Sequence, residues 1–500
     1  MKHAKHIRRL RSAVRKVSFG FAAPAVLLVL MMAAYIAVFT AAVFSEYNMF
    51  WYGNYDLGIQ DQGIWMLSQL KSPYMTARGM NLFGDHASYI HVLIAPLYWL
   101  WDDAKALLFL HTAALALGAV PVYLIARKKV DSGWTPLAFS FLYLMYPALH
   151  YSNLDQGYHY ESLTVPLVLL AYYFLIDGKH NLFYASSFLA VICKEGMALS
   201  FMLMGAYIYF RHDRRVGAIT ATFSLAYLLI SMFVLIPAFE KDGTSHNIRT
   251  MVGSFGSTPA EIMSKAANPF FMYGKIFTER NAAYFFDLLF PVAFIALYDA
   301  GFLVLSASFF VNIISDWYYS HQIEYHYVSP VIPFVFIATI NAVSKHRKDR
   351  LVTYSLLLLM AGTTLVSNVV IGPPEARITD YSRIKDGLLR FNYVSEDDRS
   401  VLQLMEMIPK DASVSTTYNW VSHLTHREKA YMIPNPFQTY LYGIDEKGVH
   451  PDRDVNYVLL DTRLVQEDEG QRQVAESIKA GGRYELIGEY KYAQLWRRRE

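Results

Sequence analysis

The charged residues of this chain fall into two groups according to the connections between apolar segments in which they lie. One group of connections is basic and comprises residues 2–16, 127–129, 211–215 and 345–350. The other is acidic, rich in His and Tyr, and comprises residues 46–86, 150–161 and 316–327. Because short loops rich in Lys and Arg stay in the cytoplasm, the second group is predicted to face outward. The pattern indicates a polytopic membrane protein whose chemistry lies on its outer face.

The composition agrees with a chain that lies in a lipid bilayer. Of the 500 residues, 54% are hydrophobic and only 17% are charged, which is too apolar for an ordinary soluble protein. The net charge of +3 is not gathered into the basic surface that nucleic-acid binding requires, so nucleic acid is not expected as a partner. The one cysteine, Cys193, excludes both an intrachain disulfide and a thiolate metal cluster.

Apolar runs predict about 11 α-helical membrane spans, since about 20 apolar residues cross a bilayer. They lie near residues 19–44, 105–126, 134–149, 162–176, 181–193, 196–210, 216–238, 283–298, 301–315, 328–344 and 351–371. The first run is too long for the apolar core of a cleaved signal peptide, so we expect an uncleaved anchor. The stretch 181–210 fits either two short helices or one bent helix.

An odd number of spans that starts inside agrees with the charges of the short loops. It places Arg127, Arg214 and Arg347 inside and Asp155, Glu195 and Glu324 outside. We therefore expect a multi-pass protein of the plasma membrane with a cytoplasmic N-terminus. The short apolar run 87–101 would invert every later loop if it crossed the membrane. It is predicted to lie at the outer interface, as is the amphipathic stretch 57–70.

The character of the chain changes after Gly372, where two prolines end the last apolar run. Beyond this point short β-like runs alternate with helical stretches, which is typical of a small α/β domain. Strands are expected near 412–417, 429–433, 457–460, 484–487 and 492–496, and helices near 397–408 and 465–479. The predicted parts are a basic cytoplasmic tail (1–18), a transmembrane domain (19–371) with structured outer loops (45–87, 150–161, 239–282 and 316–327), and an extracytoplasmic α/β domain (372–500).

The first outer loop holds acidic residues that could act in catalysis. Asp56 and Asp61 lie among aromatic and amide side chains, and Asp85 and His86 follow near the end of the loop. Carboxylates just beyond a first span can act as general bases, and Asp85 and His86 could bind substrate or hold a divalent cation. The alternative is a solvated loop in which acidic residues are ordinary, but ionisable groups near a membrane favour function.

The second outer loop, residues 150–161, combines Tyr rings with hydrogen-bonding side chains. This mixture suits a sugar, which offers an apolar ring face and hydroxyl groups, although the Tyr residues alone are typical of a membrane-interface belt. His159 and Glu161, at the mouth of a span, are predicted to bind substrate. The pair Lys194 and Glu195 is predicted either to neutralise itself at a hairpin tip or to contact a phosphate through the lysine.

The third outer loop supplies Glu324 and His326 as candidate substrate-binding residues. Together with His321 they could also ligate a metal, but histidines that are hydrogen-bonded within the loop are the favoured alternative.

Two further motifs are interpreted as not forming a functional site. Asp452, Arg453 and Asp454 match the D-x-D pattern of nucleotide-sugar enzymes, but they are expected outside the cell, where nucleotide sugars are absent. His423 and His426 could share one face of a helix, but two histidines do not make a metal site.

The order of these motifs resembles a family of bacterial and archaeal membrane proteins called domain of unknown function 2079. The matching stretches are 55–58 with 61–62, 84–86, 159–161, 194–195, 325–327 with 329–330, and 421–427, so the resemblance covers nearly the whole chain. That family is in turn similar to the GT-C glycosyltransferases, among them the aminoarabinose and mannosyl transferases of membranes.

The resemblance implies a GT-C-like helical fold and the transfer of a sugar from a polyprenyl-phosphate carrier to an envelope glycan, lipid or protein. It implies a catalytic carboxylate in the first outer loop, for which Asp56 and Asp61 remain alternatives. No cofactor is required, although a divalent metal could take part. Two other classes remain open. A transporter would place ionisable groups near the middle of the membrane, and a non-catalytic envelope or sensing protein would use the outer domain alone.

Overall fold

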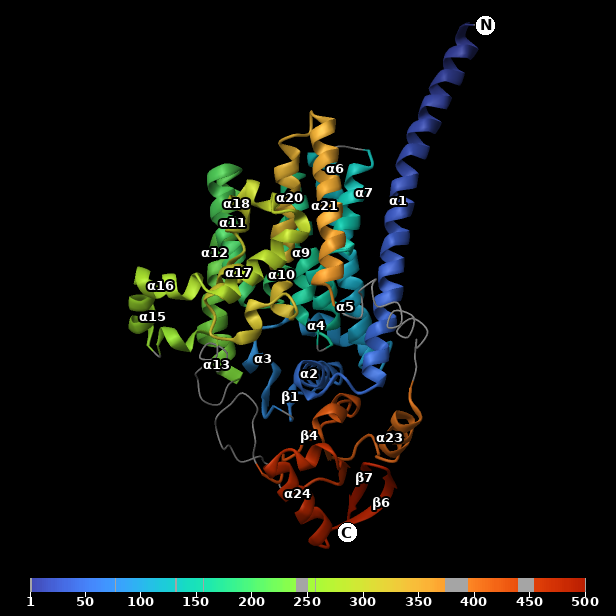
Figure 1. The fold of residues 1–500 in the computed structure, drawn as a ribbon, viewed down its shortest axis with the longest axis vertical. Helices are drawn as coiled ribbons and strands as arrows, with labels where there is room; N and C mark the ends of the chain where they lie inside the picture. The colour runs from blue at the N-terminus through green and yellow to red at the C-terminus, as the bar shows by residue number, and fades with distance from the viewer. Residues whose placement is uncertain are drawn as a thin grey trace.

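Long helices determine the shape of the protein. The computed structural model describes residues 2–76, 78–130, 133–155, 157–239, 251–256, 258–373, 394–438 and 454–499, and for residues 2–22 the backbone alone. The helices form a bundle, and an α/β domain lies at the end of the molecule that is opposite the N-terminus (Figure 1).

The helical part begins with α1 (Lys2–Asn48), α2 (Ile59–Ser68), β1 (Tyr74–Met75), β2 (Met80–Asn81), α3 (Leu82–Asp85), α4 (Ile90–Ile94), α5 (Lys105–Leu117), α6 (Ala119–Lys129), α7 (Thr135–Leu144), α8 (Pro147–Leu154), α9 (Thr164–Ile176) and α10 (His180–Val191). It continues with α11 (Gly196–Arg211), α12 (Arg214–Ile230), α13 (Ile236–Phe239), α15 (Pro259–Ala266), α16 (Pro269–Ile276), α17 (Glu279–Leu289), α18 (Ala300–Leu303), α19 (Ala307–Ile314), α20 (Ile332–Ser344) and α21 (Arg350–Val370).

Within the described residues, four helical stretches are long and apolar enough to cross a membrane. They are Ala23–Asn48, Lys105–Lys129, Arg214–Phe239 and Arg350–Val370, and each coincides with an expected span. Shorter apolar helices occupy Ile90–Trp99, Thr135–Leu144, Tyr160–Ile176 and Ile332–Ser344. A mostly helical protein with several apolar helices is therefore confirmed, while its multi-pass insertion and the number of crossings stay predictions.

Two expected spans, 283–298 and 301–315, do not form single straight helices. The helical stretches Glu279–Val292 and Ile295–Leu303 meet at an angle of 93°. Ala293 and Phe294 at the bend have left-handed φ values of 53° and 56°. Pro291 just before them cannot donate the backbone hydrogen bond that a continuing helix needs. The stretch 181–210 forms two helices, α10 and α11, which is one of the two expected alternatives.

The two predicted groups of connections lie toward different ends of the bundle. The basic turns that follow α6, α11 and α20 lie at the top of Figure 1, away from the α/β domain. At this end Lys128 contacts Asp177 at 2.5 Å, which brings together the connections after α6 and α9. The acidic and His-rich loops meet on the side of the α/β domain. The structure thus reproduces the segregation of charges read from the sequence.

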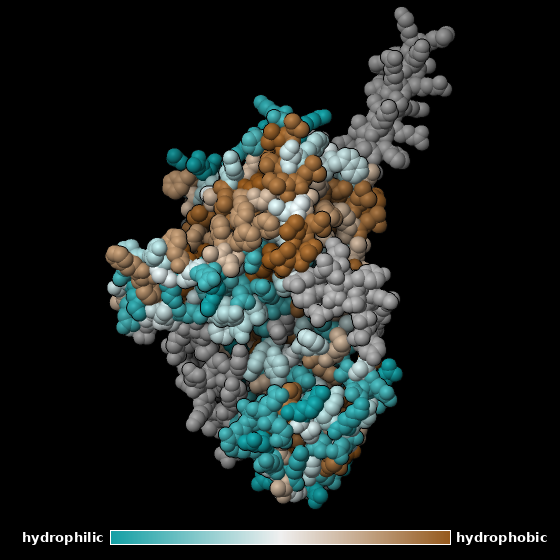
Figure 2. All heavy atoms as spheres, in the orientation of Figure 1, coloured by the Kyte–Doolittle hydropathy of each residue, from teal (hydrophilic) through white to brown (hydrophobic). Residues whose placement is uncertain are grey.

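On the face that Figure 2 shows, an apolar belt covers the upper part of the bundle. Its large exposed side chains come chiefly from α1, α12 and α21, and they include Val29, Leu30, Leu229, Leu358 and Leu365. Polar surface covers the α/β domain below the belt. Contiguous exposed apolar surface of this extent is typical of contact with lipid and not with water.

The C-terminal part forms the small α/β domain that the alternating pattern predicted. It contains α23 (Glu396–Glu406), β3 (Val414–Thr416), β4 (Ala430–Met432), β5 (Tyr457–Asp461), α24 (Glu469–Ala480), β6 (Tyr484–Tyr490) and β7 (Ala493–Arg498). The strand order is β4-β3-β5-β7-β6, in which β4, β3 and β5 are parallel and β7 is antiparallel to both neighbours.

Alternation along β5 explains why this sheet has a helix on each face. Leu459 packs in one apolar cluster with Val401 of α23, whereas Leu460 packs in another with Val474 of α24. Successive strand residues point to opposite faces of a sheet, so a continuously apolar strand needs cover on both sides.

Candidate functional site

A polar cavity of about 600 Å³ lies where the predicted outer loops meet the α/β domain. Its lining comprises Tyr55, Asp56, Ile59, Gln60, Arg78, Asp85, His86, Asp155, His159, Tyr160, Glu161, Lys194, Met251, Trp317, Tyr319, Tyr325, His326, Tyr327 and Tyr418. Four predicted outer loops and the turn between α10 and α11 thus contribute to one site, and Tyr418 is added by the α/β domain. Seven of the ten predicted site residues line this cavity: Asp56, Asp85, His86, His159, Glu161, Lys194 and His326.

Asp56 has a rare backbone conformation at the cavity wall. It lies in the short π turn η1 (Asn54–Gly58) with φ 64° and ψ −83°, close to the strained form of a γ-turn. Such a conformation costs on the order of 1–3 kcal/mol and is often kept at functional sites. Burial raises the pKa of Asp56 to about 6, a rise that Asp155 and Glu161 reinforce and His326 opposes. A carboxylate of this kind suits proton transfer near neutral pH.

Lys194 provides a cation in the same cavity. Its Nζ lies 2.5 Å from Oε1 of Glu161, and both side chains are largely buried. The ammonium group also lies 5.8 Å from the ring centres of Tyr160 and Tyr327. The sequence left a hairpin tip and a phosphate contact as alternatives. The structure places Lys194 between α10 and α11, paired across to the second outer loop.

Two further ion pairs hold the cavity wall in place. His86 Nδ1 lies 2.8 Å from Oε1 of Glu195, and the backbone N–H of Ala87 donates to Oε2 of the same carboxylate at 3.1 Å. Arg78 donates to Asp85 at 2.7 Å. Glu195 does not itself line the cavity, and its geometry is that of a residue that orients His86.

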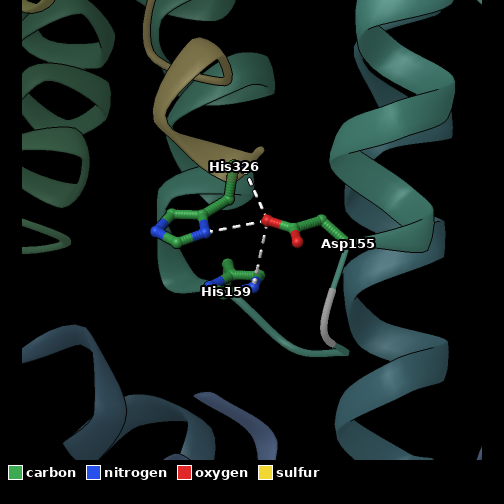
Figure 3. A group of neighbouring side chains, drawn as sticks. All are labelled: Asp155, His159 and His326. Atoms are coloured by element: carbon green, nitrogen blue, oxygen red, sulfur yellow. Dashed lines mark hydrogen bonds and ion pairs between the residues drawn. The ribbon is translucent and has the colours of Figure 1, made fainter. Parts of the chain in front are cut away.

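Asp155, His159 and His326 form a buried group at one side of the cavity (Figure 3). One ligand atom from each lies within 4.8 Å of the others, a spacing that could accommodate a metal ion. Asp155 was expected only to face outward and was not predicted as a site residue. Its spacing of four residues from His159 was the available signal.

The structure separates the two candidate catalytic acids. Asp61 is fully buried in α2, away from the cavity lining. The hydroxyls of Tyr98 and Thr425 donate to its two oxygens, and Nε2 of His426 lies 3.3 Å away. These partners leave Asp61 enclosed at the junction with the α/β domain, whereas Asp56 faces the cavity.

His423 and His426 lie at this junction. From the sequence they are not expected to form a metal site. The ring of His423 stacks on Tyr47 at 3.9 Å, and its Nε2 lies 2.9 Å from the Tyr47 carbonyl oxygen. His426 lies between Asp61 and Asp102, with its Nδ1 2.7 Å from the latter. The stretch 421–427 therefore serves to dock the α/β domain on α2.

Close approach of the backbone is a second feature of the junction. A Cβ atom on Gly53 would lie 2.2 Å from the ring of Tyr418, so only glycine fits there without a shift of the ring or the loop. The amide of Gln62 also donates to the carbonyl oxygen of Arg427 at 3.2 Å. The first outer loop and the α/β domain thus fit each other in detail.

The remaining candidates of the third loop lie outside the cavity lining. His321 is hydrogen-bonded through both ring nitrogens, to Asn281 at 2.6 Å and to the carbonyl oxygen of Ser315 at 2.9 Å. It is the satisfied loop histidine that the sequence favoured. Glu324 does not line the cavity. Of the D-x-D motif, Asp452 and Arg453 lie outside the described residues.

The contacts of His426 at the junction lead us to expect a stability that depends on pH. Burial alone would lower the pKa of His426, but Asp61 and Asp102 raise it above its ordinary value of 6.5. The stabilisation that protonated His426 gains from Asp61 and Asp102 is therefore complete below pH 6.5. It is lost as the pH rises through the raised pKa of His426. Replacing His426 with Gln should remove about 1–3 kcal/mol at pH 6 and much less at high pH. Thermal unfolding of the purified protein across this range measures the effect.

The exposed His346 provides the control for this experiment. His346→Gln should leave the unfolding temperature unchanged at every pH. Equal destabilisation by His426→Gln at low and high pH would show that its role is packing alone.

Proteins of known structure share this fold. The fold is similar to that of ArnT from Cupriavidus metallidurans bound to undecaprenyl phosphate, with a TM-score of 0.54, 11% identity, and coverage of 94% of this chain and 97% of that chain. For the apo state of ArnT the values are 0.53, 11%, 95% and 98%. An oligosaccharyltransferase from Archaeoglobus fulgidus, in complex with Zn and sulfate, has a TM-score of 0.41 and 15% identity over 89% of this chain and 71% of that chain.

The chain thus shares the fold of ArnT, and this agrees with the fold that the resemblance in the sequence implied. The chain belongs to the family of predicted membrane proteins DUF2079, whose sequence profile matches residues 46–491. No curated protein matches it.

Proposed function

We propose that this protein is a membrane glycosyltransferase that moves a sugar from a polyprenyl-phosphate donor to an envelope glycan, lipid or protein on the outer face. The observation that supports this most directly is the cavity in which Asp56, Lys194 and a set of aromatic rings face one another. A base, a cation for a phosphate and flat apolar surfaces for a sugar are the groups that such a reaction needs. The undecaprenyl phosphate bound to ArnT, which has a similar fold, is consistent with this donor class.

An apolar groove next to the cavity is suited to the lipid tail. This groove of about 380 Å³ is lined entirely by apolar residues of α4, α5, α6, α9 and α10 and of the turns beside them. It begins on the same elements as the cavity, since Leu163 follows Glu161 by two residues and Ile90 follows His86 by four. A donor with its phosphate near Lys194 would have apolar surface beside it for its tail.

The proposed chemistry uses Asp56 as a general base. Its carboxylate takes the proton of the acceptor hydroxyl as that oxygen bonds to the anomeric carbon of the sugar. The bond between this carbon and the phosphate oxygen breaks, and the polyprenyl phosphate leaves with the electron pair. Lys194 compensates the negative charge of the phosphate, which would be costly to leave unpaired at the membrane boundary.

The aromatic wall of the cavity supports a sugar as the transferred group. Trp317 and Tyr319 lie edge to face at 5.3 Å, and Tyr319 packs against Tyr325 at 4.6 Å. Rings of this kind present apolar faces to sugar C–H groups and keep a polar edge for hydroxyls.

The distribution of ionisable groups favours a transferase over a transporter. Acidic and basic side chains from several loops, among them Asp56, Glu161 and Lys194, line one cavity beside the α/β domain. His111, which lies inside α5, is hydrogen-bonded to the Ser152 carbonyl oxygen at 2.8 Å and accepts from the backbone N–H of His159 at 3.0 Å. It therefore anchors the second outer loop and does not form a relay in mid-membrane.

Orientation is part of the proposal, with the N-terminus inside and the α/β domain outside. Alkaline phosphatase fused after Arg377 should be active, and a fusion after Lys348 should be inactive, because the enzyme folds only outside the cytoplasm. The motivation is the basic character of the turn after α20. The opposite pattern of activity would contradict the outward placement of the site, and with it the proposal of a polyprenyl-phosphate donor on that face.

The direct test of function is reconstitution of the purified protein with radiolabelled polyprenyl-phosphate sugars and envelope extract. We expect label to move from the lipid to an acceptor, which gives a glycosylated product that is missing from the envelope of a deletion strain. If no polyprenyl-linked sugar binds, the protein is better explained as a non-catalytic envelope protein.

A further inference from the structure

Three side chains from two outer loops meet in a buried group that the proposed transfer reaction does not use. Asp155 ends α8, His159 precedes the turn η3 (Tyr160–Leu163), and His326 begins the turn η9 (His326–Val328). Their exposed fractions are 8%, 3% and 8%. Burying a carboxylate with two imidazoles is costly unless the polar atoms are satisfied by partners.

The polar atoms of this group are only partly satisfied by the protein. Oδ2 of Asp155 accepts from the backbone N–H of His326 at 2.8 Å and lies 3.0 Å from His326 Nδ1. By contrast, Nε2 of His159 is buried and has no hydrogen-bond partner among the described residues, although it lies 3.7 Å from the same carboxylate oxygen. A buried ring nitrogen that lacks a hydrogen-bond partner and lies near a carboxylate has its lone pair available to ligate a metal ion.

We propose that Asp155, His159 and His326 bind one divalent cation of the zinc class. Two imidazoles and one carboxylate are a common three-ligand set for zinc that keeps a fourth position open for water or substrate. Calcium and magnesium prefer oxygen ligands, so this donor set disfavours them. All three residues line the cavity, so the open position faces the space between them and Lys194.

The other acidic and histidine residues of the cavity are less suited to hold this ion. His86 is engaged by Glu195, and Asp85 is engaged by Arg78. The sequence had suggested Asp85 and His86 as the pair that could hold a cation. The structure favours the group around Asp155, because there the described nitrogen of His159 still lacks a partner.

Binding should change the arrangement of the two rings. The imidazoles of His159 and His326 now stack with centres 3.6 Å apart and planes 15° apart. Two nearly parallel rings cannot both point a nitrogen lone pair at one ion. We therefore expect the rings to fan apart when the cation enters, with ligand distances of about 2.0–2.2 Å.

The role of the cation rests on the proposed function, whereas its binding does not. His326 Nε2 lies 4.0 Å from Glu161, the partner of Lys194. A cation held beside this pair would share with Lys194 the charge of a phosphate in the cavity, and it would thereby define the donor as a phosphate-linked substrate.

The test is metal binding by the full-length protein purified in detergent and stripped with a chelator. Zinc is added back in titration and counted by mass spectrometry, and cobalt is used as a spectroscopic substitute. We expect one zinc per chain, and X-ray absorption should show two imidazoles and one carboxylate as ligands. His159→Gln should weaken zinc binding at least about tenfold, since it removes one of three ligands.

His321→Gln is the matched control, because His321 lies in the same loop as His326 but both its ring nitrogens have protein partners. It should leave zinc binding unchanged. Thermal unfolding without metal shows whether His159→Gln folds, and the more conservative His326→Asn provides a second ligand variant. Less than one zinc for every ten wild-type chains, or equal binding by wild type and both ligand variants, would overturn the proposal. Zinc binding without binding of any polyprenyl-linked sugar would refute the transferase and leave the metal site standing.

Discussion

Replacing Asp56 with Asn is expected to lower the turnover of sugar transfer by a factor on the order of 10² to 10⁴. The amide keeps the size and the hydrogen bonding of the carboxylate but cannot take a proton. Binding of the donor should therefore change little, and the loss should fall on kcat more than on KM. The position of Asp56 in the cavity and its raised pKa motivate this expectation. Initial rates with reconstituted protein and a photo-crosslinking donor analogue measure the two effects separately.

Asp61→Asn is the natural control, since it changes the other candidate acid. Asp61 is buried at the junction with Tyr98, Thr425 and His426. Its substitution should lower stability while the folded protein retains its turnover. Normal turnover in Asp56→Asn together with an inactive, folded Asp61→Asn would transfer the role of base to Asp61. Normal turnover in both variants would exclude general-base catalysis by either aspartate.

Removing the charge of Lys194 from the cavity should weaken binding of the donor phosphate. Lys194→Ala alone is a poor experiment, because it leaves Glu161 buried and unpaired and should destabilise the fold by about 3–5 kcal/mol. The double variant Glu161→Gln with Lys194→Met removes both charges and keeps the side-chain volume. Labelling by a polyprenyl-phosphate photo-crosslinker should fall at least about tenfold in this variant, since a phosphate at the membrane boundary then loses the compensating charge of Lys194.

Lys71→Met offers a matched control for the loss of a lysine. Lys71 pairs with Glu428 on the exposed surface, where a salt bridge contributes about 0–1 kcal/mol. It should label like the wild type. If the double variant labels equally well, Lys194 is a structural residue that serves only to hold Glu161.

Periodicity and turn residues made the C-terminal elements predictable. The expected strands near 457–460 and 484–487 correspond to β5 and β6, and the expected helix near 465–479 corresponds to α24. Asp468 caps that helix by accepting from the backbone N–H of Gln471, a local signal that a sequence shows directly. Apolar length likewise identified α1, α12 and α21.

The bend after α17 and the choice between Asp56 and Asp61 could not be read in the same way. Left-handed backbone at Ala293 and Phe294 has no residue signature, because neither is a glycine. Asp56 and Asp61 are the same residue type and lie five positions apart in the sequence. They are separated only because Asp56 lies in a strained turn at the cavity and Asp61 lies one helix later, facing the α/β domain.

The partners of the loop residues were also beyond the sequence. His159 was predicted as a site residue, but its neighbour His326 lies 167 positions later and is brought to it only by the packing of α8 against η9. The contribution of Tyr418 to the cavity had no signal at all in a sequence that separates the two parts by a long apolar region.

The contact between Gly53 and Tyr418 has a consequence for how the protein is made. Tyr418 leaves the ribosome after every apolar helix has been synthesised, yet it forms part of the wall of the cavity. A chain that is still being translated therefore has its acidic loops in place without the surface that closes over them. The cavity is completed only when the α/β domain has been synthesised and has docked. A truncated or stalled product would therefore lack part of the cavity wall.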